Sequence, residues 1–204
     1  MRRRVLVVLA ATALAASCDQ SPSAPTTASS AMGSPTSASI PASNGGSTAT
    51  TQSIAGGLER PITMMDACDP DTFNATIGPG TCVRSGGTTF DKFIAQLEAH
   101  QRAGAWDFMP GQTSAKVGQT FVAINRGGET HTFTEVKAFG GGVVPILNQL
   151  SGTPTVAPEC QTLEPDDFVP AGSTYRETLN EPGTRKFQCC IHPWMRLEAR
   201  VAEK

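Results

Sequence analysis

The stretch FQCCIHPWM, residues 187–195, gathers two cysteines, a histidine and a methionine into one short segment near the end of the chain. Within it, Cys189, His192 and Met195 follow one another at intervals of three residues. A thiolate, an imidazole and a thioether are side chains that bind a soft metal ion. The segment therefore predicts a metal site to which these three residues contribute.

The neighbouring cysteine, Cys190, offers a competing register. Cys190 and His192 are separated by a single residue, and this spacing makes it hard for both side chains to turn onto one small ion. Successive side chains of a strand point to opposite faces, so Phe187 and Cys189 share a face. A core-facing Phe187 then directs Cys189 inward, and both arguments select Cys189 as the ligand.

A further imidazole has to come from elsewhere in the chain, which has three histidines. His100 lies near the end of an expected helix, where a surface position is the simpler interpretation, whereas His131 lies on an expected strand after a glycine-rich turn. Two imidazoles, a thiolate and a weak thioether form the ligand set of blue-copper electron-transfer sites. We therefore predict one copper ion per chain, bound by His131, Cys189, His192 and Met195.

At this point residues 106–204 resemble a cupredoxin, and the Cys-x-x-His-x-x-Met loop is similar to that of amicyanin. The stretch VGQTFVAINRGGETHTF, residues 117–133, is similar to the region of the family's first histidine, with Gly118, Asn125 and His131 in step. PGTRKFQC, residues 182–189, matches the strand that leads into the copper cysteine. Together the two regions are specific to the family, and the resemblance covers about half of the chain.

The resemblance implies a Greek-key β-sandwich and an electron carrier that cycles between Cu(I) and Cu(II). In the family the histidine of the C-terminal loop, here His192, reaches the surface through an apolar patch. Pro193 and Trp194 would supply that patch and dock a redox partner protein; ordinary core packing is the alternative for Trp194. The alternative function is copper delivery or tolerance. The sequence contains no motif of a catalytic triad, carboxylate pair or phosphate loop, so we expect no enzyme.

Two residues depart from the family pattern. Thr132 follows the first histidine where the family often has Asn, and Leu197 stands two residues after the methionine where Gly is frequent. Neither departure removes a ligand, and Thr132 can still tie the two ligand loops together by a hydrogen bond. Glu129 is an alternative oxygen ligand, as a carboxylate is in the red-copper nitrosocyanin.

The secondary structure expected from the pattern is mostly β. Phe90, Phe93, Ile94 and Leu97 recur at helical spacing, in a helix capped by Thr88 or Thr89 and ended by Gly104. After Gly104, alternating residues cut by Gly and Pro predict about seven short strands in an antiparallel sandwich. A short helix near residues 146–150 is also expected. The fold class is therefore all-β, with a short N-terminal helix.

Five cysteines remain when Cys18 is set aside, so one has no partner within the chain. Cys68 and Cys82 bracket a Pro/Gly-rich loop and are the natural disulfide, worth about 3 kcal/mol for a loop of about 15 residues. Cys190 is expected to pair with Cys160, which leaves Cys189 as the thiol that copper requires. A disulfide between the adjacent cysteines is the alternative, and such a ring is strained.

The first 57 residues have the composition of a secretion signal followed by a tether. Residues 1–17 have the three regions of a signal peptide, with cleavage expected before a lipidated Cys18 or, alternatively, after Ala15. Residues 18–57 are a Ser/Thr/Ala/Pro/Gly-rich segment that we expect to be a disordered tether, residues 58–105 an N-terminal extension, and residues 106–204 the cupredoxin domain. We expect a monomer that is anchored to a membrane in the periplasm or at the cell surface. The net charge of −2 and the lack of a basic patch in the sequence argue against binding of nucleic acid.

Overall fold

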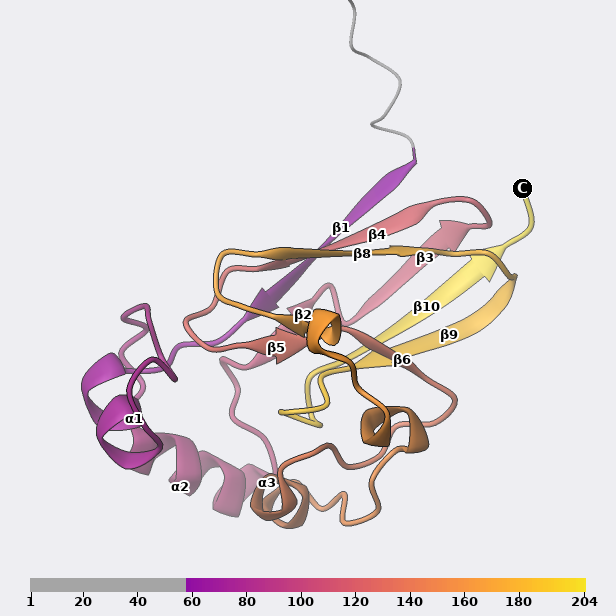
Figure 1. Cartoon of the computed structure of the whole chain (residues 1–204). Coiled ribbons are helices and arrows are strands. Elements are labelled where there is room, and N and C mark those ends of the chain that lie inside the picture. The colour runs from indigo at the N-terminus through magenta and orange to yellow at the C-terminus, as the bar shows by residue number, and fades with distance from the viewer. Residues whose placement is uncertain (1–57) are drawn as a thin grey trace, which may run out of the picture. The chain divides into compact units, whose positions relative to one another are not determined.

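Strands with alternating buried and exposed residues build two four-stranded sheets in the structure, a computed structural model that describes residues 58–204 (Figure 1). The first sheet has the order β2 (Asp107–Met109), β1 (Glu59–Met65), β4 (Thr120–Asn125) and β8 (Thr174–Thr178). The second has the order β3 (Gln112–Lys116), β10 (Arg196–Ala202), β9 (Gly183–Gln188) and β6 (Thr134–Val136). A short ribbon pairs β5 (His131–Thr132) with β7 (Phe168–Val169).

The first strand, β1, changes the expected division of the chain. It pairs parallel with β4 and antiparallel with β2, so it lies in the middle of the first sheet. Its apolar residues Ile62 and Met64 alternate with more exposed neighbours and face the core. Residues 58–105 therefore contribute a strand to the same sheet as residues 106–204, and position 105 is not a boundary between an extension and the sandwich.

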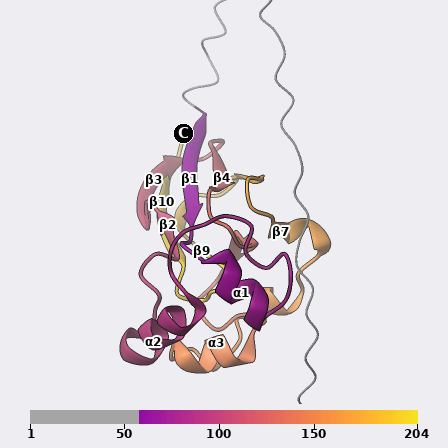
Figure 2. The same cartoon turned by 90° about the vertical axis from the view of Figure 1, so that its left-hand side faces the viewer.

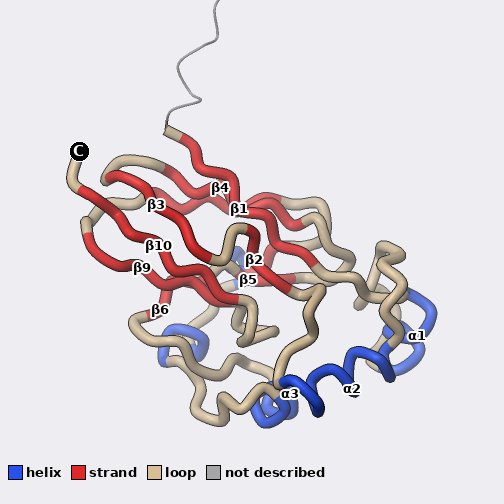
Figure 3. Tube along the Cα trace, turned by 180° about the vertical axis from the view of Figure 1, so that it is seen from behind, coloured by secondary structure: helices blue, strands red, loops and turns tan. Residues whose placement is uncertain are grey.

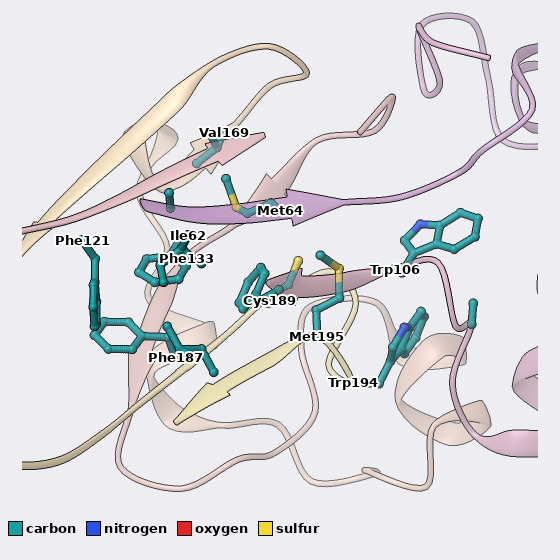
Figure 4. Packing of buried hydrophobic residues seen from close by; sticks show 14 of the residues in the cluster. Ile62, Met64, Trp106, Phe121, Phe133, Val169, Phe187, Cys189, Trp194 and Met195 are labelled. Carbon is teal, nitrogen blue, oxygen red and sulfur yellow. The ribbon is translucent and has the colours of Figure 1, made fainter. Parts of the chain in front are cut away.

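Phenylalanine rings connect the two sheets. Phe121 of β4 meets Phe187 of β9 with ring centroids 5.5 Å apart, and Phe133 stacks on Phe187 at 4.7 Å. The three rings lie together in Figure 4. Because Phe187 is fully buried, Cys189, two residues further on, is buried on the same side of the chain, as the sequence predicts.

The fold contains more helix than the expected all-β class with one short N-terminal helix. The helices are α1 (Pro70–Thr76), α2 (Phe90–His100) and α3 (Pro145–Leu150), with 3₁₀ turns η2 (Pro158–Gln161) and η3 (Pro165–Asp167). The three α-helices gather at one end of the strands (Figures 1 and 3), and Figure 2 shows them side by side beneath that end. The described residues are thus mostly β-strand, with helices that cover one end of the sandwich.

The longest helix, α2, begins where the sequence predicts and ends earlier. Thr89 is its N-cap, and its side chain accepts a hydrogen bond from the Lys92 amide. Gln101 ends the helix in the left-handed conformation, at φ 58°, and donates its amide hydrogen to the Leu97 carbonyl. The helix therefore stops at His100 and does not continue to Gly104.

Both expected disulfides are present, Cys68–Cys82 and Cys160–Cys190, and Cys189 is the free cysteine of residues 58–204. No helix within those residues has the length and apolar character needed to cross a bilayer. The predicted signal peptide, the lipidated Cys18 and the tether lie outside the described residues.

Candidate metal centre

Three ligand atoms from two separate parts of the chain converge at the helical end of the sandwich. The Cys189 Sγ lies 3.9 Å from His131 Nδ1 and 3.8 Å from His192 Nδ1, and the two Nδ1 atoms are 3.3 Å apart. All three residues are buried, with exposed fractions of 2% or less. The structure thus brings together three of the four residues of the predicted site around one point.

Backbone hydrogen bonds hold the C-terminal ligand loop in a tight turn. The Cys189 amide donates to the Met195 carbonyl at 3.1 Å, and the Met195 amide donates to the His192 carbonyl at 2.9 Å. Met195 is fully buried. Figure 4 shows the Met195 and Cys189 side chains directed to the same side of the loop. This placement suits a weak axial thioether beside the thiolate.

Thr132 links the two ligand loops, as the sequence predicts. Its hydroxyl oxygen accepts a hydrogen bond from the Cys190 amide at 2.8 Å. Its own amide hydrogen points to the Cys189 sulfur, with the nitrogen 3.4 Å from Sγ. The replacement of Asn by Thr at this position therefore preserves a connection between the loops.

The Cys189 sulfur is prepared for the thiolate form. Burial raises the pKa of the thiol, but hydrogen bonds and positive charge from His131 and His192 lower that pKa well below its ordinary value. Amide hydrogens of Thr132 and His192 also point to Sγ, each with N···S 3.4 Å. Donors directed at a sulfur stabilise its negative charge, and the thiolate is the form that binds metal.

Asp66, which the sequence analysis does not identify, orients His131. Its Oδ2 lies 2.9 Å from His131 Nε2, and both side chains are buried. Burial alone would lower the pKa of His131, but the hydrogen bond to Asp66 and the interaction with Cys189 together raise the pKa to about 9. Burial likewise opposes the charge of Asp66, yet hydrogen bonds from His131 and nearby amides lower its pKa to about 2. With Nε2 engaged in this way, Nδ1 is the nitrogen that faces the sulfur.

Asp66 also fixes the turn that precedes His131. Its Oδ1 accepts from the Gly128 amide at 2.9 Å and the Cys68 amide at 3.2 Å, and its Oδ2 accepts from the Glu129 amide at 3.0 Å. A Cβ atom at Gly127 would lie 1.9 Å from Asp66 Oδ2. The glycine that the sequence marks as a turn is therefore required for the close approach of this carboxylate.

Glu129 lies beside the centre and faces away from its middle. Its Oε2 accepts a hydrogen bond of 2.6 Å from Trp106 Nε1 and lies 3.6 Å from His192 Nε2. Burial raises the pKa of this carboxyl, against the opposing charge of His192. Since the carboxylate faces the ring nitrogen opposite Nδ1, it is not placed as a ligand, and the alternative oxygen ligand finds no support in this geometry.

The three atoms fit a single metal ion. Metal bonds to nitrogen and sulfur ligands are roughly 2.0–2.3 Å long, so two ligand atoms of one ion are separated by at most about 4.0–4.4 Å. All three measured separations are below that limit. Two imidazoles and one thiolate, with a buried methionine in the same loop, are the donor set of blue copper.

The apolar surface patch expected at His192 is not formed. Pro193 is buried, and Trp194 is 9% exposed. Phe93 of α2 packs against Trp194 and His192, with its ring centroid 5.9 Å from that of Trp194 and 6.4 Å from that of His192. Packing of the N-terminal helix therefore encloses the histidine that the family pattern would leave near the surface.

The sandwich and the His-Cys-His-Met set define a cupredoxin-like fold with a candidate type 1 copper site. Among solved structures, an amicyanin mutant with Cu(I) is 21% identical, over 47% of this chain and 73% of its own, at a TM-score of 0.33. A purple cupredoxin from Nitrosopumilus maritimus is 18% identical, over 52% of this chain and 90% of its own, at a TM-score of 0.36. No protein-family model and no curated protein matches the chain. At this level of likeness, the assignment of the centre rests on its own residues.

Proposed function

We propose that this protein is a mononuclear type 1 copper protein that carries single electrons between partner proteins. The observation that carries the proposal is the convergence of His131 Nδ1, Cys189 Sγ and His192 Nδ1 in a buried site. Copper in this set would accept and return one electron, since the thiolate suits Cu(I) and the imidazoles suit both oxidation states.

The residues of the chain hold that geometry in place. Asp66 fixes the ring of His131 from its far nitrogen, and the hydrogen-bonded turn fixes Cys189, His192 and Met195 relative to one another. Groups held from behind move little when the charge of the site changes. Phe93 covers part of the His192 ring, with the ring centroids 6.4 Å apart. A rigid, buried ligand set favours repeated electron transfer over chemistry on a bound substrate.

The burial of the ligands also bears on the choice between electron transfer and copper delivery, the two functions that would use the same residues. A protein that delivers copper has to present its ligands to an acceptor, which replaces them one at a time. Here Cys189 and Met195 are fully buried and His192 is 2% exposed. This enclosure supports electron transfer over copper delivery, because an electron does not require contact with the metal.

The decisive test is the visible spectrum of the copper-loaded protein, with two cysteine variants as matched partners. We expect a strong thiolate-to-copper absorption in the wild type, its loss in Cys189→Ser and its retention in Cys190→Ser. Cys190→Ser breaks a disulfide that closes a loop of about 30 residues, so it should lower the free energy of unfolding by about 3–4 kcal/mol. A coloured Cys189→Ser protein beside a colourless Cys190→Ser protein would contradict the assignment.

We further propose that the carrier is exported to the periplasm or the cell surface and is anchored there by a lipid at Cys18. We propose that it is a monomer with a Greek-key sandwich and that it exchanges electrons with a redox partner protein. The support is the signal-like sequence before Cys18 and the charge-free composition after it. A Cys18→Ala variant should leave the membrane fraction. An unmodified mature N-terminus that begins at Ala16, found by mass spectrometry, would refute the anchor.

A further inference from the structure

A cavity of about 510 Å³ lies at the helical end of the molecule, next to the candidate metal centre. Its walls come from α1, α2, α3 and the ligand loop, and they are almost entirely apolar. The residues that form most of the wall are Phe73, Phe90, Phe93, Ile94, Val144, Leu147 and Ile191. Its volume falls within the roughly 300–1,000 Å³ typical of small-molecule sites.

The cavity opens to solvent beside two apolar residues. Ile77, just after α1, and Ile146, in α3, both line it, and each is 56% exposed. Isolated apolar side chains at a surface are ordinary, but here they flank the entrance to an apolar chamber. A molecule from solution therefore has access to the chamber without the helices moving apart.

Three residues of the wall have polar side chains: Thr81, whose hydroxyl donates to the Gly78 carbonyl, and the nearly buried Glu129 and His192. Glu129 uses Oε2 to accept from Trp106, while its Oε1 makes no hydrogen bond to any residue in 58–204. This oxygen is not one of the fully buried polar atoms that lack a partner, so solvent reaches it and it can accept a hydrogen bond from a small molecule in the cavity.

We propose that this cavity binds a small aromatic molecule that carries one hydroxyl group, with its ring among the apolar residues and its hydroxyl donating to Glu129. The apolar walls suit an aromatic body, and the carboxylate oxygen of Glu129 suits a hydroxyl donor. A neutral hydroxyl fits better than an ammonium group, because a charge is far costlier to move into an apolar chamber.

The ligand would lie against the outer edge of His192, the residue through which the chain contacts both the cavity and the metal centre. This placement goes beyond the proposed electron carrier and does not depend on it, since the cavity and Glu129 are present without metal. Binding can therefore be measured on the metal-free protein, and a failed copper experiment would leave this test unaffected.

The experiment titrates the metal-free full chain with 2-naphthol and with 2-methoxynaphthalene, which has a methyl group in place of the donated hydrogen. We expect 2-naphthol to bind with a Kd below about 1 mM and to shift the NMR signals of the His192 ring. We expect 2-methoxynaphthalene to bind at least about tenfold more weakly, because a hydrogen bond to a charged group is worth at least that factor.

Three variants make the result specific. Glu129→Gln retains one acceptor oxygen, which Trp106 occupies, and places an NH₂ group in the cavity; the preference for 2-naphthol should then disappear. Ile94→Trp fills the chamber and should abolish binding of both probes. Ala95→Trp adds the same ring to an exposed position on the same helix and should leave binding unchanged.

Two results would overturn the proposal. One is equal affinity for the two probes in the wild type, which would show that Glu129 does not recognise the hydroxyl. The other is an absence of binding by either probe, which would leave the chamber to an apolar side chain of a partner protein.

Discussion

Replacement of Asp66 by Asn tests whether the carboxylate beneath His131 organises the centre. The change preserves the size of the side chain and alters only which hydrogen bonds it accepts. In the wild type each carboxylate oxygen accepts from two donors: Oδ1 from the amides of Cys68 and Gly128, and Oδ2 from the Glu129 amide and His131. An asparagine has one carbonyl oxygen, so its NH₂ group must face one of these pairs of donors.

The magnitude follows from the donors left without an acceptor. If the NH₂ group faces Cys68 and Gly128, both amides lose their acceptor. If it faces Glu129 and His131, the histidine can move its proton to Nδ1, and the Glu129 amide alone is left unpaired. Each buried unpaired donor costs about 1–3 kcal/mol, and the side chain adopts the orientation that leaves one donor unpaired, so we expect the free energy of unfolding to fall by about 1–3 kcal/mol.

The second orientation also affects metal binding. It places the proton on His131 Nδ1, the atom that lies 3.9 Å from the Cys189 sulfur. Copper at Nδ1 would then require a proton on Nε2, where the NH₂ group now opposes it, and the site would lose the support of the carboxylate behind the ring. Loss of such a supporting group typically lowers metal affinity by about 10–100-fold.

Two measurements examine the prediction: denaturant unfolding of the metal-free variant, and copper titration against a competing chelator. Asp71→Asn is the control, since Asp71 lies on the exposed side of α1, and the change should cost less than about 1 kcal/mol. If Asp66→Asn unfolds within about 0.5 kcal/mol of the wild type and binds copper equally well, the role given to Asp66 is incorrect.

Three further variants test neighbouring features. Met195→Leu should still bind copper and give a higher reduction potential by voltammetry, since the axial ligand tunes that potential; an unchanged potential would argue against axial ligation. Gly127→Ala places a Cβ atom 1.9 Å from Asp66 Oδ2, so its loss of stability and of copper affinity should resemble those of Asp66→Asn, and a wild-type melting curve would contradict the packing. Thr132→Val removes the acceptor of the buried Cys190 amide and should lower the free energy of unfolding by about 1–3 kcal/mol, whereas no change in denaturant titration would mean that the amide finds another acceptor.

The candidate site in the C-terminal loop could be predicted from the sequence because it depends on local spacing. The positions of Cys189, His192 and Met195 within one turn are specified by three-residue intervals, and strand alternation distinguishes Cys189 from its neighbour. The Cys68–Cys82 disulfide was indicated by the loop that these residues bracket, and the odd number of cysteines indicated that one thiol would remain free. His131 required a second motif, yet its chain position after a glycine turn was sufficient to select it.

Asp66 was not predictable because tertiary pairing brings it to the site. It lies 65 residues before His131 in the chain and reaches it because β1 pairs parallel with β4. Apolar residues at alternate positions of ERPITMM, Ile62 and Met64, predict a strand there. The pattern does not reveal which other strand pairs with it. The enclosure of Trp194 was hidden for the same reason, since Phe93 meets it only when α2 packs across the end of the sandwich.

The adjacent cysteines Cys189 and Cys190 have different oxidation states because their side chains lie in different parts of the core. Cys189 belongs to the core of the sandwich, whereas Cys190 packs with Cys160, Val136 and Ala157 in a separate small cluster. The two cysteines are adjacent in the chain, yet the Cys190 sulfur forms a disulfide with Cys160 and the Cys189 sulfur is a free thiol. The Cys160–Cys190 disulfide therefore leaves the thiol of Cys189, the candidate metal ligand, free, because the Cys189 side chain lies in the other cluster.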